Sequence, residues 1–125
     1  MTEPIVFVSH FRIKSEKLEA FKEHASEISG LLESDKPRTS AFLSYIDDEG
    51  RDVTIVHVFR DADAMDAHVQ GADESARAAY EFMDPAGWEI YGKPNTNVLE
   101  MLQRAATASG VSLVVQPEHV SGFLR

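Results

Sequence analysis

The chain has 125 residues, of which 43% are apolar, and this length fits a single domain with a modest hydrophobic core. Its 21 acidic and 12 basic residues give a formal net charge of −9, which argues against nucleic acids and anionic membranes as partners. Cysteine is absent, which excludes disulfide and thiol chemistry, and the apolar run 5–8 is too short for a signal peptide or membrane span, so we expect a cytoplasmic protein.

The first half of the chain predicts a strand, a helix and a β-hairpin. Residues 5–13 are rich in β-branched and aromatic types and predict a strand that is apolar on both faces. Residues 18–32 carry an apolar stripe at spacings of three and four, which predicts a helix with Ser15 as its N-cap. Residues 41–47 and 52–60 predict two further strands, joined by a turn in which Gly50 is left-handed.

The second half predicts further helices and strands. Asp61 is the expected N-cap of a helix that Gly71 interrupts, and another helical segment is expected at about 73–83. Residues 88–92 predict a short strand, and 95–108 predict a helix that Gly110 ends. Residues 111–115 alternate in polarity, which favours a fifth strand at a sheet edge, in this chain or in a partner's sheet, or else an extended tail.

The order of these elements predicts the fold class. The sequence β-α-β-β-α-β is that of a ferredoxin-like α+β domain, here followed by a C-terminal helix and a possible extra strand. Helices on one face of such a sheet leave the other face open, and that face is also apolar in the first and third strands. A soluble monomer does not tolerate a large exposed apolar face, so we expect a homodimer in which a second copy covers it.

Two segments resemble a known family. Residues 11–16, followed by Phe21, and residues 57–68 are similar to the strand-to-helix motifs of the antibiotic-biosynthesis monooxygenase (ABM) superfamily. The resemblance covers residues 4–93 and implies a dimeric α/β barrel, in which two ferredoxin-like sheets pack face to face and each subunit holds a ligand cavity. We therefore expect an ABM-like domain over residues 1–93, with residues 94–125 as a C-terminal extension of the same domain.

The resemblance has departures that bear on activity. His57 stands where the family usually has Glu, and Phe59 where it usually has Trp. Ser9 and His68 stand where the haem-degrading branch has Asn and Trp, which argues against haem degradation. The branches that oxidise quinols or polyketide anthrones have looser residue requirements, and this sequence neither meets nor fails them clearly.

Two histidines are the candidate catalytic residues. His57 lies in the middle of a predicted strand, as a satisfied core histidine or as a base in an apolar pocket. His68 lies on the following helix, as a packing or dimer-contact residue or as a second catalytic group. No pair of the five histidines has tight metal-ligand spacing and no nucleotide or phosphate motif occurs, so we expect neither a metal nor a cofactor.

The candidate ligand-binding residues are polar or aromatic side chains suited to the wall of a cavity: Ser9, Arg12, Phe59, Tyr80 and Trp88. Arg12 is suited to a substrate carboxylate or enolate, with a surface ion pair as the alternative. The aromatic residues are suited to a cavity wall, with ordinary core packing as the alternative.

Two classes of function remain open at this stage. The first is a cofactor-independent monooxygenase that acts on a quinol- or anthrone-like aromatic, whose anion reduces oxygen in a dry pocket. The second is a non-catalytic, small-ligand-binding or stress-associated dimeric α/β-barrel protein, since a fold alone does not determine activity.

Overall fold

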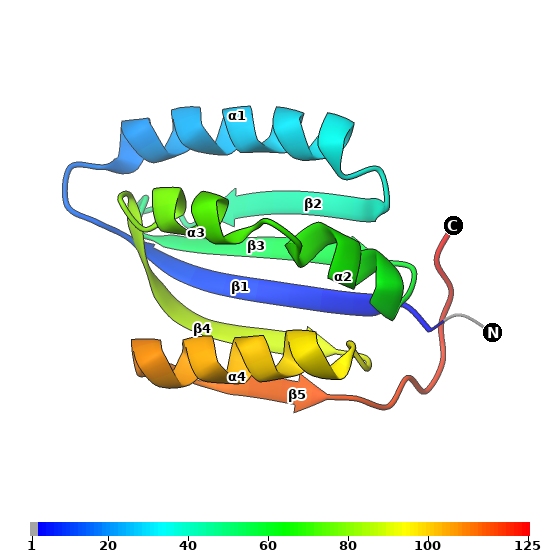
Figure 1. Cartoon of the computed structure of the whole chain (residues 1–125). Coiled ribbons are helices and arrows are strands. Elements are labelled where there is room, and N and C mark those ends of the chain that lie inside the picture. The colour runs from blue at the N-terminus through cyan, green and yellow to red at the C-terminus, as the bar shows by residue number, and fades with distance from the viewer. Residues whose placement is uncertain (1–2) are drawn as a thin grey trace.

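A five-stranded sheet carries all four helices on one face (Figure 1). The structure, a computed structural model, describes residues 3–125, except for the side chains of residues 73 and 75, so the first two residues of the expected domain lie outside the described part. The elements in chain order are β1 (Ile5–Ile13), α1 (Leu18–Asp35), β2 (Thr39–Ile46), β3 (Asp52–Phe59), α2 (Ala62–Val69), α3 (Asp73–Ala79), β4 (Met83–Tyr91), α4 (Thr96–Ser109) and β5 (Leu113–Gln116).

The sheet topology confirms the predicted ferredoxin-like α+β fold. The strand order is β2-β3-β1-β4-β5; the first four strands are antiparallel to their neighbours, and β5 is parallel to β4. The tail after β5 runs back toward the start of β1, where the Arg60 guanidinium donates to the main-chain oxygen of Arg125 over 3.3 Å (Figure 1). None of the described helices is long and apolar enough to span a membrane.

Three local predictions about turns and caps are confirmed. The Asp61 carboxylate accepts a hydrogen bond from the Ala64 amide at 2.8 Å and so caps α2. Gly50 in the β2–β3 turn has a φ of 69°, and Gly110 at the end of α4 has a φ of 68°. Both angles lie in the left-handed region that glycine occupies without steric cost.

Two predictions about boundaries are wrong. Ser15 does not cap α1, which begins after Lys17 without a side-chain hydrogen bond at its cap. β4 begins at Met83 instead of residue 88, and α3 correspondingly ends at Ala79. The sequence did not indicate this longer strand, because Pro85 disfavours a strand. The proline is tolerated because β4 has only one neighbouring strand there and its pairing with β1 shifts register between His10 and Phe11.

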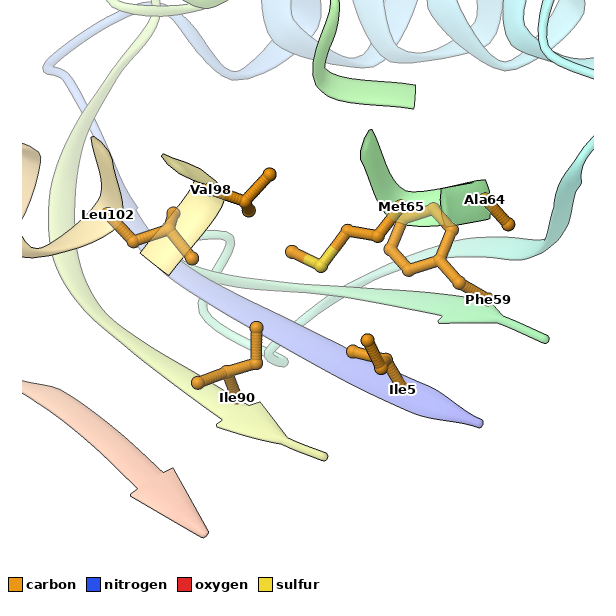
Figure 2. Close-up of a cluster of buried hydrophobic side chains, with 7 residues drawn as sticks. All are labelled: Ile5, Phe59, Ala64, Met65, Ile90, Val98 and Leu102. Carbon is orange, nitrogen blue, oxygen red and sulfur yellow. The ribbon is translucent and has the colours of Figure 1, made fainter. Parts of the chain in front are cut away.

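The helix-covered face of the sheet holds two apolar clusters. Figure 2 shows the first cluster, which draws on β1, β3, α2, β4 and α4: Ile5, Phe59, Ala64, Met65, Ile90, Val98 and Leu102. The second lies toward the other end of the sheet: Phe11, Phe21, Val53, Ile55 and Met83. On β1 and β3 the positions between the clusters include Ser9 and His57, which are the two polar residues that the described part of the chain buries.

The opposite face of the sheet is apolar and has no helix over it. Alternate residues of β1 and β3, including Val8 and Val56, point to this open face. Leu43 on β2 is 47% exposed, Tyr45 is 60% exposed, and Val114 on β5 is 42% exposed. The open face therefore keeps the apolar surface that the two-faced strands predicted.

Candidate functional site

The two candidate catalytic histidines meet on the helix-covered face. β3 carries His57, and the chain then turns directly into α2, which lies back over the sheet and presents His68. The two ring centroids are 5.1 Å apart, and the rings meet edge to face at 80°. The fold thus brings together the two histidines that the sequence singled out.

Phenylalanine rings from three strands surround the histidine pair. The Phe59 ring lies 6.1 Å from the His57 ring and 5.2 Å from the His68 ring, centroid to centroid. Phe7 on β1 and Phe42 on β2 contact His57 from either side, at centroid distances of 5.2 Å and 5.0 Å. The walls around the imidazoles are therefore flat and apolar, which is the surface that a planar aromatic ligand packs against.

His57 is held in one tautomer by the main chain. Its Nδ1–H donates to the Phe7 carbonyl oxygen over 3.3 Å, since a carbonyl only accepts, and this leaves a lone pair on Nε2. Burial is the main cause that lowers the pKa of His57 from 6.5 to about 3, and charge on His68 lowers it further. His57 is therefore a neutral hydrogen-bond acceptor at physiological pH.

His68 is held by a residue of β2. Its Nδ1 lies 2.6 Å from the Thr39 Oγ1. Burial, followed by the nearby charge of Lys36, lowers the pKa of His68 from 6.5 to about 4. Both rings are thus neutral near pH 7, so the site contains two imidazoles without a fixed charge on either.

Ser9 and Trp88 lie on the same face as the histidines. Ser9 is paired with Ile55 on one side and with Trp88 on the other, and both Ser9 and Trp88 are buried. Neither the Ser9 hydroxyl nor the His57 Nε2 forms a hydrogen bond with a described residue. Among the described residues, however, no fully buried side-chain nitrogen or oxygen atom lacks a hydrogen-bond partner. Neither atom is therefore completely sealed from solvent.

Two of the expected ligand-binding residues lie elsewhere. Tyr80 follows α3 and packs with the second apolar cluster, where burial raises its pKa. Arg12 lies on the open face, because its position on β1 is out of phase with Ser9, and it forms an exposed ion pair with Asp52 at 3.1 Å. Of the expected set, Phe59 therefore contacts both histidines. Ser9 and Trp88 share the face of the sheet that carries His57, and the Trp88 ring packs edge to face against Phe11 of the second cluster.

Two hollows of the described surface lie over the outer side of α4 and between Arg60 and the C-terminal segment 119–124. Neither contains His57 or His68. Within residues 3–125, described side chains form no group of three or more histidine, aspartate or glutamate residues that could hold a metal ion.

Sequence reasoning missed three residues of the site. Strand alternation places Phe7 on the same face as Ser9, and this signal could have identified it. Phe42 faces His57 because β2 and β3 form the predicted hairpin, so the register set by its turn could have identified Phe42. Thr39 meets His68 only because α2 packs against the start of β2, and that packing left no local signal in the sequence.

Comparisons with known proteins show the family and the fold of this chain. The family model described as antibiotic biosynthesis monooxygenase matches residues 4–80. Among solved structures, MupZ from Pseudomonas fluorescens is 18% identical, with 98% of this chain and 91% of that chain covered at a TM-score of 0.72. A mutant form of SnoaB, a cofactor-independent oxygenase from Streptomyces nogalater, is 16% identical, with 74% and 95% covered at a TM-score of 0.60.

A third solved structure has the same fold. A conserved protein from Methanosarcina mazei Go1 is 21% identical, with 70% of this chain and 87% of that chain covered at a TM-score of 0.56. A search among curated protein sequences found no match. Identities this low show the shared fold alone, whereas the family model spans more than half of the chain. This chain belongs to the antibiotic biosynthesis monooxygenase family.

Proposed function

We propose that this protein is a cofactor-independent monooxygenase that oxidises a planar aromatic of quinol or anthrone type, with His57 as the base and His68 as the second catalytic group. The observation that carries the proposal is the pair of neutral imidazoles, edge to face among phenylalanine rings, in a chain of this family. SnoaB, which shares the fold, is a cofactor-independent oxygenase. The cytoplasm is the location that we predict for this protein.

The reaction is balanced by the substrate itself. The His57 Nε2 accepts a proton from the substrate, which leaves an aromatic anion rich enough in electrons to reduce oxygen. The ring carbon bonds to oxygen, and the peroxide that forms takes back the proton from His57. The carbon then loses its remaining hydrogen as the O–O bond breaks, so that one oxygen atom stays as a ring carbonyl and the other leaves as water. The substrate supplies all the electrons.

The low basicity of His57 sets a condition on this role. Burial lowers the pKa of His57 to about 3, so the unliganded protein holds a weak base. The substrate anion that forms beside the imidazolium attracts it, which offsets part of the cost of proton transfer.

We assign ligand contact to three of the expected residues, which lie on the face of the sheet that carries His57. Phe59 and Trp88 offer flat apolar surfaces, and the Ser9 hydroxyl has no described protein partner and is free to bond a substrate oxygen. Arg12 and Tyr80 are left out of this set, because the first lies on the open face and the second packs with the other cluster.

The proposed working form is a homodimer in which two open faces pack together into an α/β barrel. A row of polar side chains crosses this apolar face: Thr54 bonds His10 at 3.3 Å, His10 bonds Glu89, and Tyr91 donates to the other oxygen of Glu89. These bonds, from Tyr91 first, lower the pKa of Glu89. Because the row is hydrogen-bonded within its own chain, a second copy would cover it without leaving these polar side chains without partners.

Oxygen uptake tests the proposed activity. We expect the parent protein to consume oxygen with at least one compound from a panel of quinols and anthrones. His57→Ala should lower kcat about a hundredfold or more, since it removes the base. His119→Ala, an exposed histidine of the tail, is the matched control and should leave the rate unchanged. Unchanged turnover in His57→Ala would remove His57 from the base role.

The second candidate function is binding without catalysis, which the depressed pKa values of both histidines favour. Trp88 is the single tryptophan of the chain and is buried, so its fluorescence reports on ligands near Ser9. Saturable quenching by compounds that cause no oxygen uptake would support this second function and count against the monooxygenase.

A further inference from the structure

We propose that Thr39 is a positioning residue that fixes the tautomer of His68, so that the histidine pair presents one hydrogen-bond acceptor and one donor to the substrate. The role in turnover rests on the proposed function, whereas the tautomer itself is a property of the free protein. Thr39 is the first residue of β2, and it reaches His68 across the space between β2 and α2.

The α1–β2 connection holds Thr39 in place. The Thr39 amide donates to the Lys36 carbonyl oxygen at 3.0 Å. The Lys36 ammonium in turn donates to the main-chain oxygens of Ala67 at 3.2 Å and Gln70 at 3.0 Å, at the C-terminal end of α2. The α1–β2 turn thus forms hydrogen bonds both to Thr39 and to the C-terminal end of α2, which carries His68. These bonds account for the close Thr39–His68 contact.

The length of the contact indicates which partner donates. His68 Nδ1 is the side-chain partner of the Thr39 hydroxyl among the described residues, and the two atoms are 2.6 Å apart. This is shorter than the usual distance for an N–H donor and lies within the usual distance for a hydroxyl donor. If the hydroxyl donates, its proton is satisfied and Nδ1 uses its lone pair. The neutral His68 then carries its proton on Nε2.

The Nε2 atoms of the two histidines consequently have opposite hydrogen-bonding roles. The Phe7 carbonyl places the proton of His57 on Nδ1 and leaves Nε2 as an acceptor, whereas Thr39 leaves His68 with Nε2–H as a donor. An acceptor for the substrate hydroxyl and a donor for the oxyanion that forms are the two groups that anion formation needs. The other tautomer of His68 would place two acceptors in the site and would leave the oxyanion without this donor.

Nitrogen NMR of the full chain tests the tautomer without any substrate. In the parent we expect the imidazole ¹⁵N shifts and ring-proton couplings of His68 to show Nε2–H, and those of His57 to show Nδ1–H. Thr39→Val removes the hydroxyl with little change in shape and should shift His68 to a mixture of tautomers, whereas Thr39→Ser should keep the parent pattern. His57 should not change in either variant. Nδ1–H on His68 in the parent would overturn the proposal, even if Thr39→Val does not fold.

Kinetics tests the consequence for turnover. With a compound that the parent oxidises, Thr39→Val should lower kcat by at least about tenfold, as loss of tautomer control does elsewhere, while KM changes little. Thr39→Ser should restore most of the rate. An equal kcat in all three proteins would overturn the positioning role. If the parent oxidises no compound in the panel, the proposed function fails, and the NMR result still decides the tautomer.

Discussion

At the scale of single residues, the histidine pair couples folding to pH. In the unfolded chain each imidazole has a pKa near 6.5 and takes up a proton as the pH falls below that value, whereas folding lowers the pKa of His57 to about 3 and that of His68 to about 4. Between these limits the unfolded state binds more protons than the folded state. The stability from neutral burial is therefore present above pH 6.5 and is lost as the pH falls toward 4.

Urea unfolding at several pH values measures this coupling. Between pH 6 and pH 5 we expect the free energy of unfolding to fall by about 1.4 kcal/mol per pH unit for each histidine that is protonated only when unfolded. His57→Gln should reduce the slope by about one proton, while His119→Gln should not change it. A parent whose stability does not vary over this pH range would show that the histidines are not buried in neutral form.

At the scale of elements, the segment after Gly92 contributes to the core. α4 buries Val98, Leu102 and Ala106 and returns the chain to β5, which extends the sheet beside β4. Trp88 pairs with Leu113, so β5 also supports the strand that carries a proposed ligand contact. Removing residues 93–125 would therefore expose the first apolar cluster and the edge of β4. The division of the domain at residue 93 stays a prediction.

A single substitution in α4 tests this contribution. Leu102→Ala should lower the free energy of unfolding by about 2–4 kcal/mol, because it leaves a cavity between α4 and the sheet. The neighbouring Gln103 is exposed, so Gln103→Ala should change it by less than about 0.5 kcal/mol. Thermal or urea melts of both variants give the comparison, and equal stability of the two would show that α4 is dispensable for the core.

At the scale of the whole molecule, the open face predicts self-association. Sedimentation at micromolar concentration should give about twice the chain mass of 13.9 kDa. Val56 lies in the middle of the open face, between Val8 and Leu43, so Val56→Asp should place a charge in the interface and give monomers. Ala20→Asp, on the exposed side of α1, is the control and should remain dimeric. A parent that stays monomeric and binds no hydrophobic dye would contradict the dimer.

The sequence by itself determined the elements and the character of the faces. Strands 5–13 and 52–60 were predictable because alternation and β-branched residues act locally, and Asp61, Gly50 and Gly110 were predictable because caps and turns depend on neighbouring residues. The apolar open face followed from the same alternation. The choice of His57 and His68 as candidates rested on residue type and family resemblance, which need no coordinates.

Only the tertiary structure decided which groups meet. Thr39 reaches His68 because α2 packs against the start of β2, and a contact of this kind depends on packing between segments far apart in the chain. The sequence did not predict the start of β4, because Pro85 disfavours a strand locally. In the fold this part of β4 pairs with β1 on one side and has no neighbouring strand on the other, so the proline is tolerated. The neutral state of the histidines is likewise tertiary, since burial between sheet and helices lowers the pKa of each.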